Sequence, residues 1–456
     1  MKPLAFLCLL VLLLAGCSPF ETNPASTAIV REKAEPTPTP TAAATPTPKP
    51  TTAMVEICPS QENNYFYAKC YTPYTLRVAY GIETLIEQGF TGKGQTVVDV
   101  VAFGSPTLQR DIDVFDQWFG LPAVKIQVIS PLGTVPFDPH DKNMVGWASE
   151  TELDVQMIHA IAPDAGIVVM TGPGNDSSAF LELEQYAVSH HLGQVFSQSF
   201  GISEAALANN GGAQFAQDYA DFYKQITIQQ GWTIVSASGD SGATDYVDPD
   251  MKILSPTPTV DFPADIPWVT AVGGTTLLED IPNVYNERAW RLSGGGVSKI
   301  FLEPDFQQGL SSLIQKQLAG QRGLPDVAAD ADPLTGMAFY WNGQWGLTGG
   351  TSASTPLWAG LIAIANQMAG HPLGFINPGL YKLEALQNAR SHFPNEPGIG
   401  SSTQKDFRDI TEGDNSFDLK TVHVKGFQAV TGWDAITGWG APQASQFIPD
   451  LIAVLT

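Results

Sequence analysis

One serine in this chain has the surroundings of a candidate nucleophile. Ser352 lies in the stretch TGGTSASTPLWAG (348–360), where two glycines lead into small and apolar residues with helical spacing. A serine hydroxyl becomes a nucleophile when a general base takes its proton. Serine is also a common helix cap, because its oxygen satisfies unpaired backbone N–H groups at a helix start. The stretch alone favours the cap, so the nucleophile hypothesis depends on partners elsewhere in the chain.

Histidine is the usual base for such a serine, but none of the seven histidines has a suitable setting. His159 falls on the apolar face of a predicted helix, which favours a packed core position. His190 and His191 end a helical run before a glycine, which favours a cap. A histidine-based triad is therefore poorly supported.

A pair of carboxylates offers another base. Glu150 and Asp154 stand four residues apart in WASETELDVQMIHAIAPDAG (147–166), and this spacing places both on one face of a helix. Leu153, Met157 and Ile161 are expected to face the core. Two neighbouring carboxylates can share a proton, because like charges raise one pKa, and such a pair can act as a base in acid. A solvated helix face is the common alternative for this spacing.

Two further acids need an interpretation. Glu152 points away from the face shared by its neighbours and is expected to meet solvent. Asp240 ends the predicted strand TIVSASGD (233–240), where a carboxyl group would be aimed at a substrate carbonyl. A plain turn is the alternative for Asp240, because aspartate and glycine both favour turns.

The elements that must position these residues alternate along the chain. Five short apolar runs, each ended by glycine or proline, predict buried strands at 95–103, 166–173, 194–201, 233–240 and 269–275. Amphipathic segments such as 215–231 predict helices between them. The alternation predicts an α/β fold with a predominantly parallel twisted sheet and helices on both faces. Ligands of such sheets bind beyond the carboxyl ends of the strands, where several of these runs end in polar, glycine-rich turns.

The charge of the chain excludes some partners. Acidic residues number 46 against 23 basic ones, which gives a net charge of −23. This balance argues against nucleic acid and anionic lipid as partners. It suits a protein that must stay soluble in acid, although ordinary solubility explains it equally well.

The N-terminal segment has the pattern of an export signal. Residues 1–16 join Lys2 to an apolar core too short to span a bilayer as a mature helix. Their end, LLAGC, resembles a bacterial lipobox, which implies cleavage before Cys17 and lipidation of its thiol; a plain secretory signal is the alternative. Residues 17–35 form a short segment, and the prolines of 36–52 favour an extended linker. We expect an extracytoplasmic protein, anchored to a membrane surface through Cys17 or secreted.

The rest of the chain reads as one unit. Cys58 and Cys70 are the only cysteine pair outside the export segment, and in an exported chain such a pair predicts a disulfide. No second linker and no internal repeat interrupt the stretch from Tyr71 to Thr456.

Several motifs in order resemble the sedolisins, a family of serine-carboxyl peptidases with a subtilisin-like fold. The resemblance begins near Tyr71, and it assigns residues 53–456 to a sedolisin-like peptidase domain. The motifs are Glu150-x-x-x-Asp154 ahead of Ala162-Pro163, SASGDSG around Asp240, FPADIPWVTAVGGT (262–275), SGGG (293–296), RGLPDVAADADP (322–333), GTSASTP at Ser352, DIT (409–411) and VTGWDAITGWG (430–440).

The resemblance implies a role for each catalytic position. Ser352 would attack the scissile carbonyl, and Glu150 would take its proton and return it to the leaving amine. Asp154 would hold Glu150 in place and tune its pKa. Asp240, protonated, would donate a hydrogen bond to the oxyanion together with the backbone N–H of Ser352. Because Glu150 must be ionised while Asp240 is neutral, the resemblance implies activity in acid.

The resemblance also implies binding groups. Two segments would pair with the substrate backbone as added strands do: Ser199, Phe200 and Gly201, and Ser293, Gly294, Gly295 and Gly296. Since calcium prefers oxygen ligands, one Ca²⁺ ion would be held by the side chains of Asp409 and Asp434 and the carbonyls of Ile410, Val430 and Gly432. A glycine-rich surface turn around buried Trp433 and Trp439 is the alternative for these loops.

The chain departs from the family in one respect, and alternatives remain open. Sedolisins usually carry a long folded prodomain, and too few residues separate Cys17 from Tyr71 to hold one. The leading hypothesis is a monomeric endopeptidase or tripeptidyl peptidase that acts on peptides or proteins. A weakly active or inactive peptide-binding surface lipoprotein on the same fold is an alternative. A glycosidase with paired carboxylates is another, but it would leave Ser352 and Asp240 unexplained.

Overall fold

The computed structural model describes residues 70–209, 212–248, 251–383, 405–419 and 421–456. The predicted signal (1–16), the segment 17–35, the linker 36–52, Cys17 and Cys58 lie outside the described residues. Cys70 is disulfide-bonded, and its partner cysteine also falls outside the described part of the chain.

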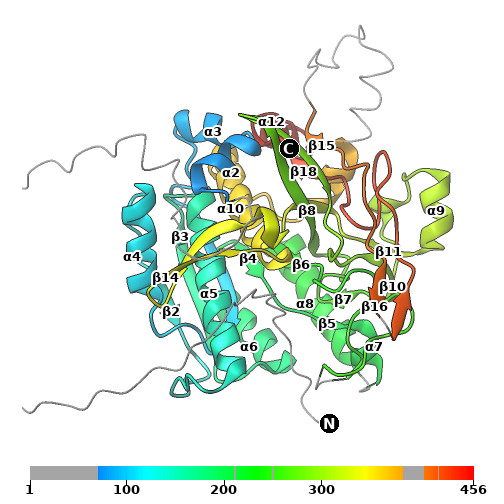
Figure 1. The fold of residues 1–456 in the computed structure, drawn as a ribbon, viewed down its shortest axis with the longest axis horizontal. Coiled ribbons are helices and arrows are strands. Elements are labelled where there is room, and N and C mark those ends of the chain that lie inside the picture. The colour runs from blue at the N-terminus through cyan, green and yellow to red at the C-terminus, as the bar shows by residue number, and fades with distance from the viewer. Residues whose placement is uncertain (1–69, 210–211, 249–250, 384–404, 420) are drawn as a thin grey trace, which may run out of the picture.

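An eight-stranded sheet forms the centre of the molecule (Figure 1). Its strands are β1 (Thr96–Ala102), β2 (Gln127–Ile129), β3 (Gly166–Gly172), β4 (Val195–Gln198), β6 (Thr233–Ala237), β8 (Thr270–Ile281), β9 (Val284–Ala289) and β12 (Val327–Asp330). The order β2-β3-β1-β4-β6-β8-β12 is parallel throughout, and β9 pairs antiparallel with β8. The five predicted strands are confirmed as β1, β3, β4, β6 and β8, and so is the predicted parallel sheet.

Helices connect and cover these strands. They are α2 (Pro73–Ala79), α3 (Glu83–Glu87), α4 (Leu108–Phe119), α5 (Lys142–Ile161), α6 (Ser177–Ser189), α7 (Glu204–Asn209), α8 (Ala213–Gln230), α9 (Ser312–Leu318), α10 (Thr351–Ala369) and α12 (Ala444–Leu455). Two short 3₁₀ turns, η1 (Asp305–Gln307) and η2 (Pro333–Thr335), lie between strands. Within the described ranges, every helix is too short or too polar to cross a bilayer.

Smaller strand pairs lie outside the central sheet. They are β5 (Ile202–Ser203) with β7 (Asp261–Phe262), β10 (Gly296–Leu302) with β11 (Gln321–Leu324), β13 (Met337–Trp341) with β14 (Gln344–Thr348), β15 (Phe407–Arg408) with β18 (Ala441–Pro442), and β16 (Phe417–Leu419) with β17 (Val422–Val424).

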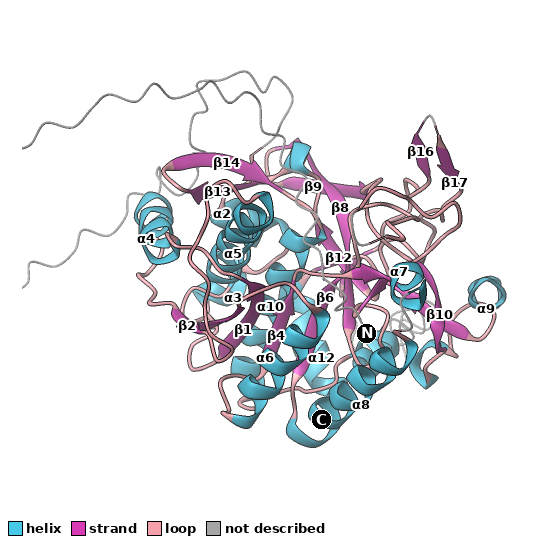
Figure 2. Ribbon diagram, turned by 90° about the horizontal axis from the view of Figure 1, so that it is seen from below, coloured by secondary structure: helices cyan, strands magenta, loops and turns pink. Residues whose placement is uncertain are grey.

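Polar side chains in the strands show which helices cover which face. Asp99 of β1 shares a hydrogen bond with Asp154 of α5, and Ser197 of β4 is its neighbour in register. The next residue, Gln198, points to the opposite face because side chains alternate along a strand. There it donates to Glu184 of α6 at 2.6 Å and also meets α8. Helix α5, with α10 packed beside it, therefore lies on one face, and α6 and α8 lie on the other (Figure 2).

Helix α5 has no solvent face, which corrects one expectation. Every residue from Trp147 to Ile161 is buried. Glu152, expected to meet solvent, is fully buried and accepts hydrogen bonds from Ser105 Oγ at 2.7 Å and Gln156 Nε2 at 3.3 Å. The expectation is wrong because α4 and β13 pack against the side of α5 that the sequence pattern left open.

Two histidine predictions are confirmed. His159 is fully buried, with its Nε2 2.9 Å from the Pro122 carbonyl oxygen and 3.1 Å from Asp116 Oδ1. His190 is the C-cap residue of α6, and its ring stacks on Tyr186. Neither histidine lines the cavity that holds Ser352.

Candidate active site

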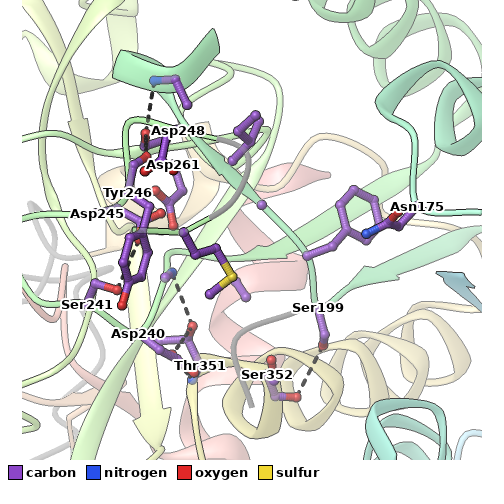
Figure 3. A pocket seen from close by; sticks show the side chains of 18 of the residues that line it. Asn175, Ser199, Asp240, Ser241, Asp245, Tyr246, Asp248, Asp261, Thr351 and Ser352 are labelled. Carbon is purple, nitrogen blue, oxygen red and sulfur yellow. Dashed lines mark hydrogen bonds between the residues drawn. The ribbon is translucent and has the colours of Figure 1, made fainter. Parts of the chain in front are cut away.

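Ser352 is the second residue of α10 and not its cap. The N-cap position belongs to Gly350, which has a φ of 90° and makes no side-chain cap hydrogen bond. The positive φ accounts for a glycine there, because residues with a Cβ rarely adopt it. Ser352 is 6% exposed. It lines a cavity of about 250 Å³ together with Ala237, the last residue of β6, so the cavity lies beyond the carboxyl end of that strand (Figure 3).

Pro356 leaves the Ser352 carbonyl without its helical partner. In an α-helix the N–H of residue 356 would donate to the carbonyl of residue 352, but proline has no N–H. The Ser199 hydroxyl lies 3.2 Å from this carbonyl oxygen and 2.7 Å from Asp154 Oδ1. One side chain therefore links the backbone of the candidate nucleophile to the helix that carries the candidate base.

Three carboxyl groups gather between α5 and β1. Glu150, Asp154 and Asp99 are all fully buried. Burial raises the pKa of Asp99 and of Asp154 well above the usual range, and the negative charge of Glu150 raises both pKa values further. The Asp99–Asp154 hydrogen bond lowers the pKa of Asp99 and raises that of Asp154. Burial and the neighbouring charge therefore favour protons on the Asp99–Asp154 pair.

Asp99 is the member of this group that sequence reasoning missed. It stands alone as a charged residue in the apolar run Thr96–Ala102. An acid inside a buried strand is costly unless it is paired or neutralised. The single acid inside this apolar run was the sequence feature that could have identified Asp99 as a functional candidate.

Asp240 lies on the other side of Ser352, on the loop after β6. Its Oδ1 accepts hydrogen bonds from the backbone N–H of Thr351 at 2.7 Å and from the Thr351 hydroxyl at 2.8 Å. Because both groups donate to Oδ1, a proton on this carboxyl group resides on Oδ2. A Cβ on Gly350 would come within 2.5 Å of that Oδ2 atom. The close approach of Asp240 is therefore a second reason why position 350 requires a glycine.

The electrostatics of Asp240 suit a hydrogen-bond donor. Burial raises the pKa of Asp240 to about 6, and the charge of Asp245 also raises it, while the two bonds from Thr351 lower it. The carboxyl group is therefore mostly neutral below pH 6. A neutral carboxyl group can donate to an oxyanion, whereas a carboxylate would repel one.

The first expected substrate segment lines the cavity. Ser199, Phe200 and Gly201 border it with Ser352 and Asp240. The segment comes directly before β5, so extended backbone leads from the candidate nucleophile along the cavity wall.

The second expected segment, 293–296, is buried and does not line the cavity. Gly294 donates its N–H to the Gly239 carbonyl at 2.7 Å, and its own carbonyl accepts from the Ser238 hydroxyl at 2.7 Å. Ser293 Oγ donates to the Ile436 carbonyl at 2.9 Å. Both backbone groups of Gly294 therefore bond within the protein and hold the loop that carries Asp240, and pairing of 293–296 with substrate stays a prediction.

The expected metal ligands lie on two segments, 409–410 and 430–434, which are hydrogen-bonded to each other. Asp409 accepts from the Gly432 N–H at 3.1 Å, and Asp434 Oδ2 accepts from the Val430 N–H at 3.2 Å. Burial raises the pKa of both carboxyl groups, that of Asp434 to about 7. Across the described residues, no group of three His, Cys, Asp or Glu side chains is placed to hold a metal ion by itself, so a metal here would depend on carbonyl oxygens such as that of Ile410.

The sequence of this chain matches a known protein family. The sequence model of the subtilase family matches residues 135–392, which is more than half of the chain and includes the positions of the catalytic motifs. The chain belongs to the subtilase family. Asp99 lies ahead of the matched range.

Within the subtilases, the chain groups with the sedolisins. Kumamolisin from Bacillus sp. (strain MN-32) is 32% identical over 355 residues, which cover 76% of this chain and 57% of kumamolisin. Human tripeptidyl-peptidase 1 is 31% identical over 250 residues, covering 51% of this chain and 42% of that protein. The chain therefore spans about half the length of these curated relatives.

A solved structure agrees with this placement. A Pseudomonas sedolisin, a serine-carboxyl proteinase complexed with pseudo-iodotyrostatin, superposes with a TM-score of 0.68 at 27% identity. The superposition covers 85% of this subtilase and the whole of the sedolisin chain.

Proposed function

We propose that this subtilase is an acid-active serine-carboxyl peptidase that hydrolyses peptide bonds through Ser352. One observation carries the proposal: Ser352 stands in a cavity between two sets of buried carboxyl groups, with Ser199 reaching Asp154 on one side and Thr351 reaching Asp240 on the other. Among the described residues that line this cavity there is no histidine. The names of the similar proteins, which are peptidases, support the same activity.

The chemistry follows from the protonation states. Ser352 Oγ attacks the carbonyl carbon while Glu150 takes the hydroxyl proton. The carbonyl oxygen becomes an oxyanion, which accepts hydrogen bonds from protonated Asp240 and the Ser352 N–H. When the tetrahedral intermediate collapses, Glu150 returns the proton to the leaving amine. Water then attacks the acyl-enzyme with Glu150 again as the base, and Ser352 is regenerated.

The pH range has an upper limit set by Asp240. Its pKa is raised to about 6, so the donor proton is present below that pH and is lost as the pH rises through it. Glu150 must be ionised, which sets the lower limit. Activity should therefore be confined to acid solution.

The test is digestion of a denatured protein by the full chain from pH 2 to pH 8, with products identified by mass spectrometry. We expect cleavage in acid that falls as the pH rises through about 6, absent in Ser352→Ala. Inhibition by pseudo-iodotyrostatin, the compound bound to the Pseudomonas sedolisin, is a second readout. Cleavage that peaks near pH 8 or survives Ser352→Ala would show the proposal to be wrong.

We further propose that Asp409 and Asp434 hold one Ca²⁺ ion with the carbonyls of Ile410, Val430 and Gly432. The donor set fits, because it consists of oxygen atoms alone. Neither carboxyl group forms an ion pair with a lysine or arginine among the described residues, so a cation would neutralise them. When bound, the ion would tie 409–410 to 430–434 and supply no catalytic step.

Chelation tests this site by thermal unfolding. At a pH above the raised pKa of Asp434, about 7, where both ligands are ionised, removing calcium should lower the melting temperature by roughly 5 °C, and added calcium should restore it. Asp434→Asn should remove the response to chelator while the protein remains folded. A melting temperature that is the same with and without chelator would contradict the site.

A further inference from the structure

Asp245 and Asp261 form a carboxyl pair next to Asp240. Both line the cavity that holds Ser352 (Figure 3). Asp261 is in β7, and its Oδ2 is so close to Gly239 that a Cβ there would lie 2.3 Å away. Asp245 follows Asp240 by five residues on the same loop. The pair therefore sits against the peptide that carries the candidate oxyanion donor.

The hydrogen bonds around the pair decide where its proton resides. Asp245 Oδ1 accepts from the Ser241 hydroxyl at 3.1 Å, and Asp245 also accepts from the backbone N–H of Tyr246. A carboxyl group that receives donors is favoured as a carboxylate. Burial raises the pKa of both acids, and the bond between them lowers the pKa of Asp245 and raises that of Asp261 further. When the pair has lost one proton, the remaining proton therefore lies on Asp261 and the negative charge on Asp245.

The other ionisable groups near the pair do not remove this charge. The charge of Glu204 raises the pKa of Asp261, and burial together with the charges of Glu204 and Asp261 raises the pKa of Asp265. The ammonium group of Lys299 bonds the Pro258 carbonyl, and Arg322 pairs with Asp326. The remaining titratable groups that line the cavity are Asp240, Tyr246 and Asp248.

We propose that Asp245 and Asp261 act as a positioning pair whose single negative charge keeps Asp240 protonated as the oxyanion donor. This inference rests on the proposed peptidase function, because it assigns Asp240 that role. The physical reason is Coulombic: a fixed negative charge nearby disfavours a second one on Asp240. The pair thus extends activity toward higher pH without touching the reacting atoms.

The test compares pH–rate profiles of kcat/KM for the wild type, Asp261→Asn and the double variant Asp245→Asn/Asp261→Asn. The double variant holds no charge, so the alkaline limb should move to lower pH by roughly one unit. Asp261→Asn is the matched control, since its amide N–H can replace the acid proton and leave the charge on Asp245. Whatever it does to the rate, its alkaline limb should stay where the wild type has it. Asp245→Asn alone should shift the limb in the same direction by less.

Two outcomes overturn the inference. One is a double variant whose alkaline limb coincides with that of the wild type; the other is Asp261→Asn shifting the limb as far as the double variant does. Failure of the proposed function looks different, because the wild type would then show no Ser352-dependent cleavage at any pH.

A measurement that needs no activity separates the two cases. In full-length protein labelled with ¹³C-aspartate, the Asp240 carboxyl resonance, identified by its loss in Asp240→Asn, gives the pKa directly. The pKa should fall in the double variant and stay unchanged in Asp261→Asn; an unchanged pKa in the double variant overturns the inference. Melting temperatures recorded in acid show that each variant is folded.

Discussion

Two clusters of acids flank Ser352, and they handle protons in opposite ways. The base cluster (Asp99, Glu150 and Asp154) is sealed between α5 and β1, with all three side chains fully buried. The oxyanion cluster (Asp240, Asp245 and Asp261) lines the cavity. In the first cluster, burial and the negative charge of Glu150 raise the pKa of the two supporting acids, Asp99 and Asp154. In the second, burial and the negative charge of Asp245 raise the pKa of Asp240 itself, the candidate donor.

Under the proposed function, the difference shows how one chemical group, the carboxyl group, can supply both a base and a hydrogen-bond donor at one pH. Burial raises the pKa of acids in both clusters, so burial alone cannot assign the roles. Hydrogen bonds and neighbouring charges assign them: Ser199 and Asp99 contact Asp154, whereas Thr351 donates twice to Asp240. Separating the protonation states of paired acids is a general way to run acid and base chemistry in one site.

The largest effect should come from removing the base. Glu150→Gln should lower kcat/KM by on the order of 10³-fold or more, because the amide cannot accept the Ser352 proton. Glu152→Gln, on the same buried helix, is the matched control. Burial raises the pKa of Glu152 to about 8, so this acid is already neutral in the acid range and glutamine resembles it. Steady-state kinetics near pH 4 should show a full loss in the first variant and a small one in the second. Comparable losses would mean that packing on α5, and not the charge of Glu150, is what matters.

The oxyanion cluster should give a smaller effect with a different signature. Asp240→Ala removes the donor and should reduce kcat by on the order of 10²- to 10³-fold. Asp240→Asn keeps an N–H in the position of Oδ2 and an acceptor for Thr351, so it should lose less. Because an amide does not titrate, the fall in activity near pH 6 seen in the wild type should disappear in this variant. If the alkaline limb persists unchanged in Asp240→Asn, another group sets it.

The two clusters also differ in how far the sequence predicts them. Glu150 and Asp154 are found by helical spacing, and Asp240 by its place at the end of an apolar strand. The burial of Glu152 could not be predicted, because the hydrophobic periodicity of a sequence describes one helix and not the elements that pack against it. The same holds for Asp99, whose partner lies 55 residues away along the chain and meets it only when α5 packs on β1.

The strands are predicted better than the contacts between loops. Short apolar runs with glycine or proline at their ends are enough for β1, β3, β4, β6 and β8. For the segment 293–296, the family resemblance implies substrate binding, and in the structure Gly294 bonds the loop 238–239 of the protein itself. A glycine run predicts that something approaches the backbone closely. Whether that is substrate or another loop depends on the tertiary fold.

The smallest effect should come from the connection between the base cluster and Ser352. Ser199 links Asp154 Oδ1 to the Ser352 carbonyl, which Pro356 leaves without an N–H donor. Ser199→Ala should lower kcat by roughly tenfold with little change in KM, because the base helix and the nucleophile lose their common support.

Ser354→Ala is the matched control for this last substitution. Ser354 lies in α10 and is buried, as Ser199 is, and its hydroxyl bonds the Gly273 carbonyl at 2.9 Å. Both variants lose a buried hydroxyl, so their melting temperatures should fall by similar amounts. Only Ser199→Ala should lower kcat. Equal kcat values for the two variants would show that the serine contributes stability alone and that the base and oxyanion clusters act on Ser352 independently.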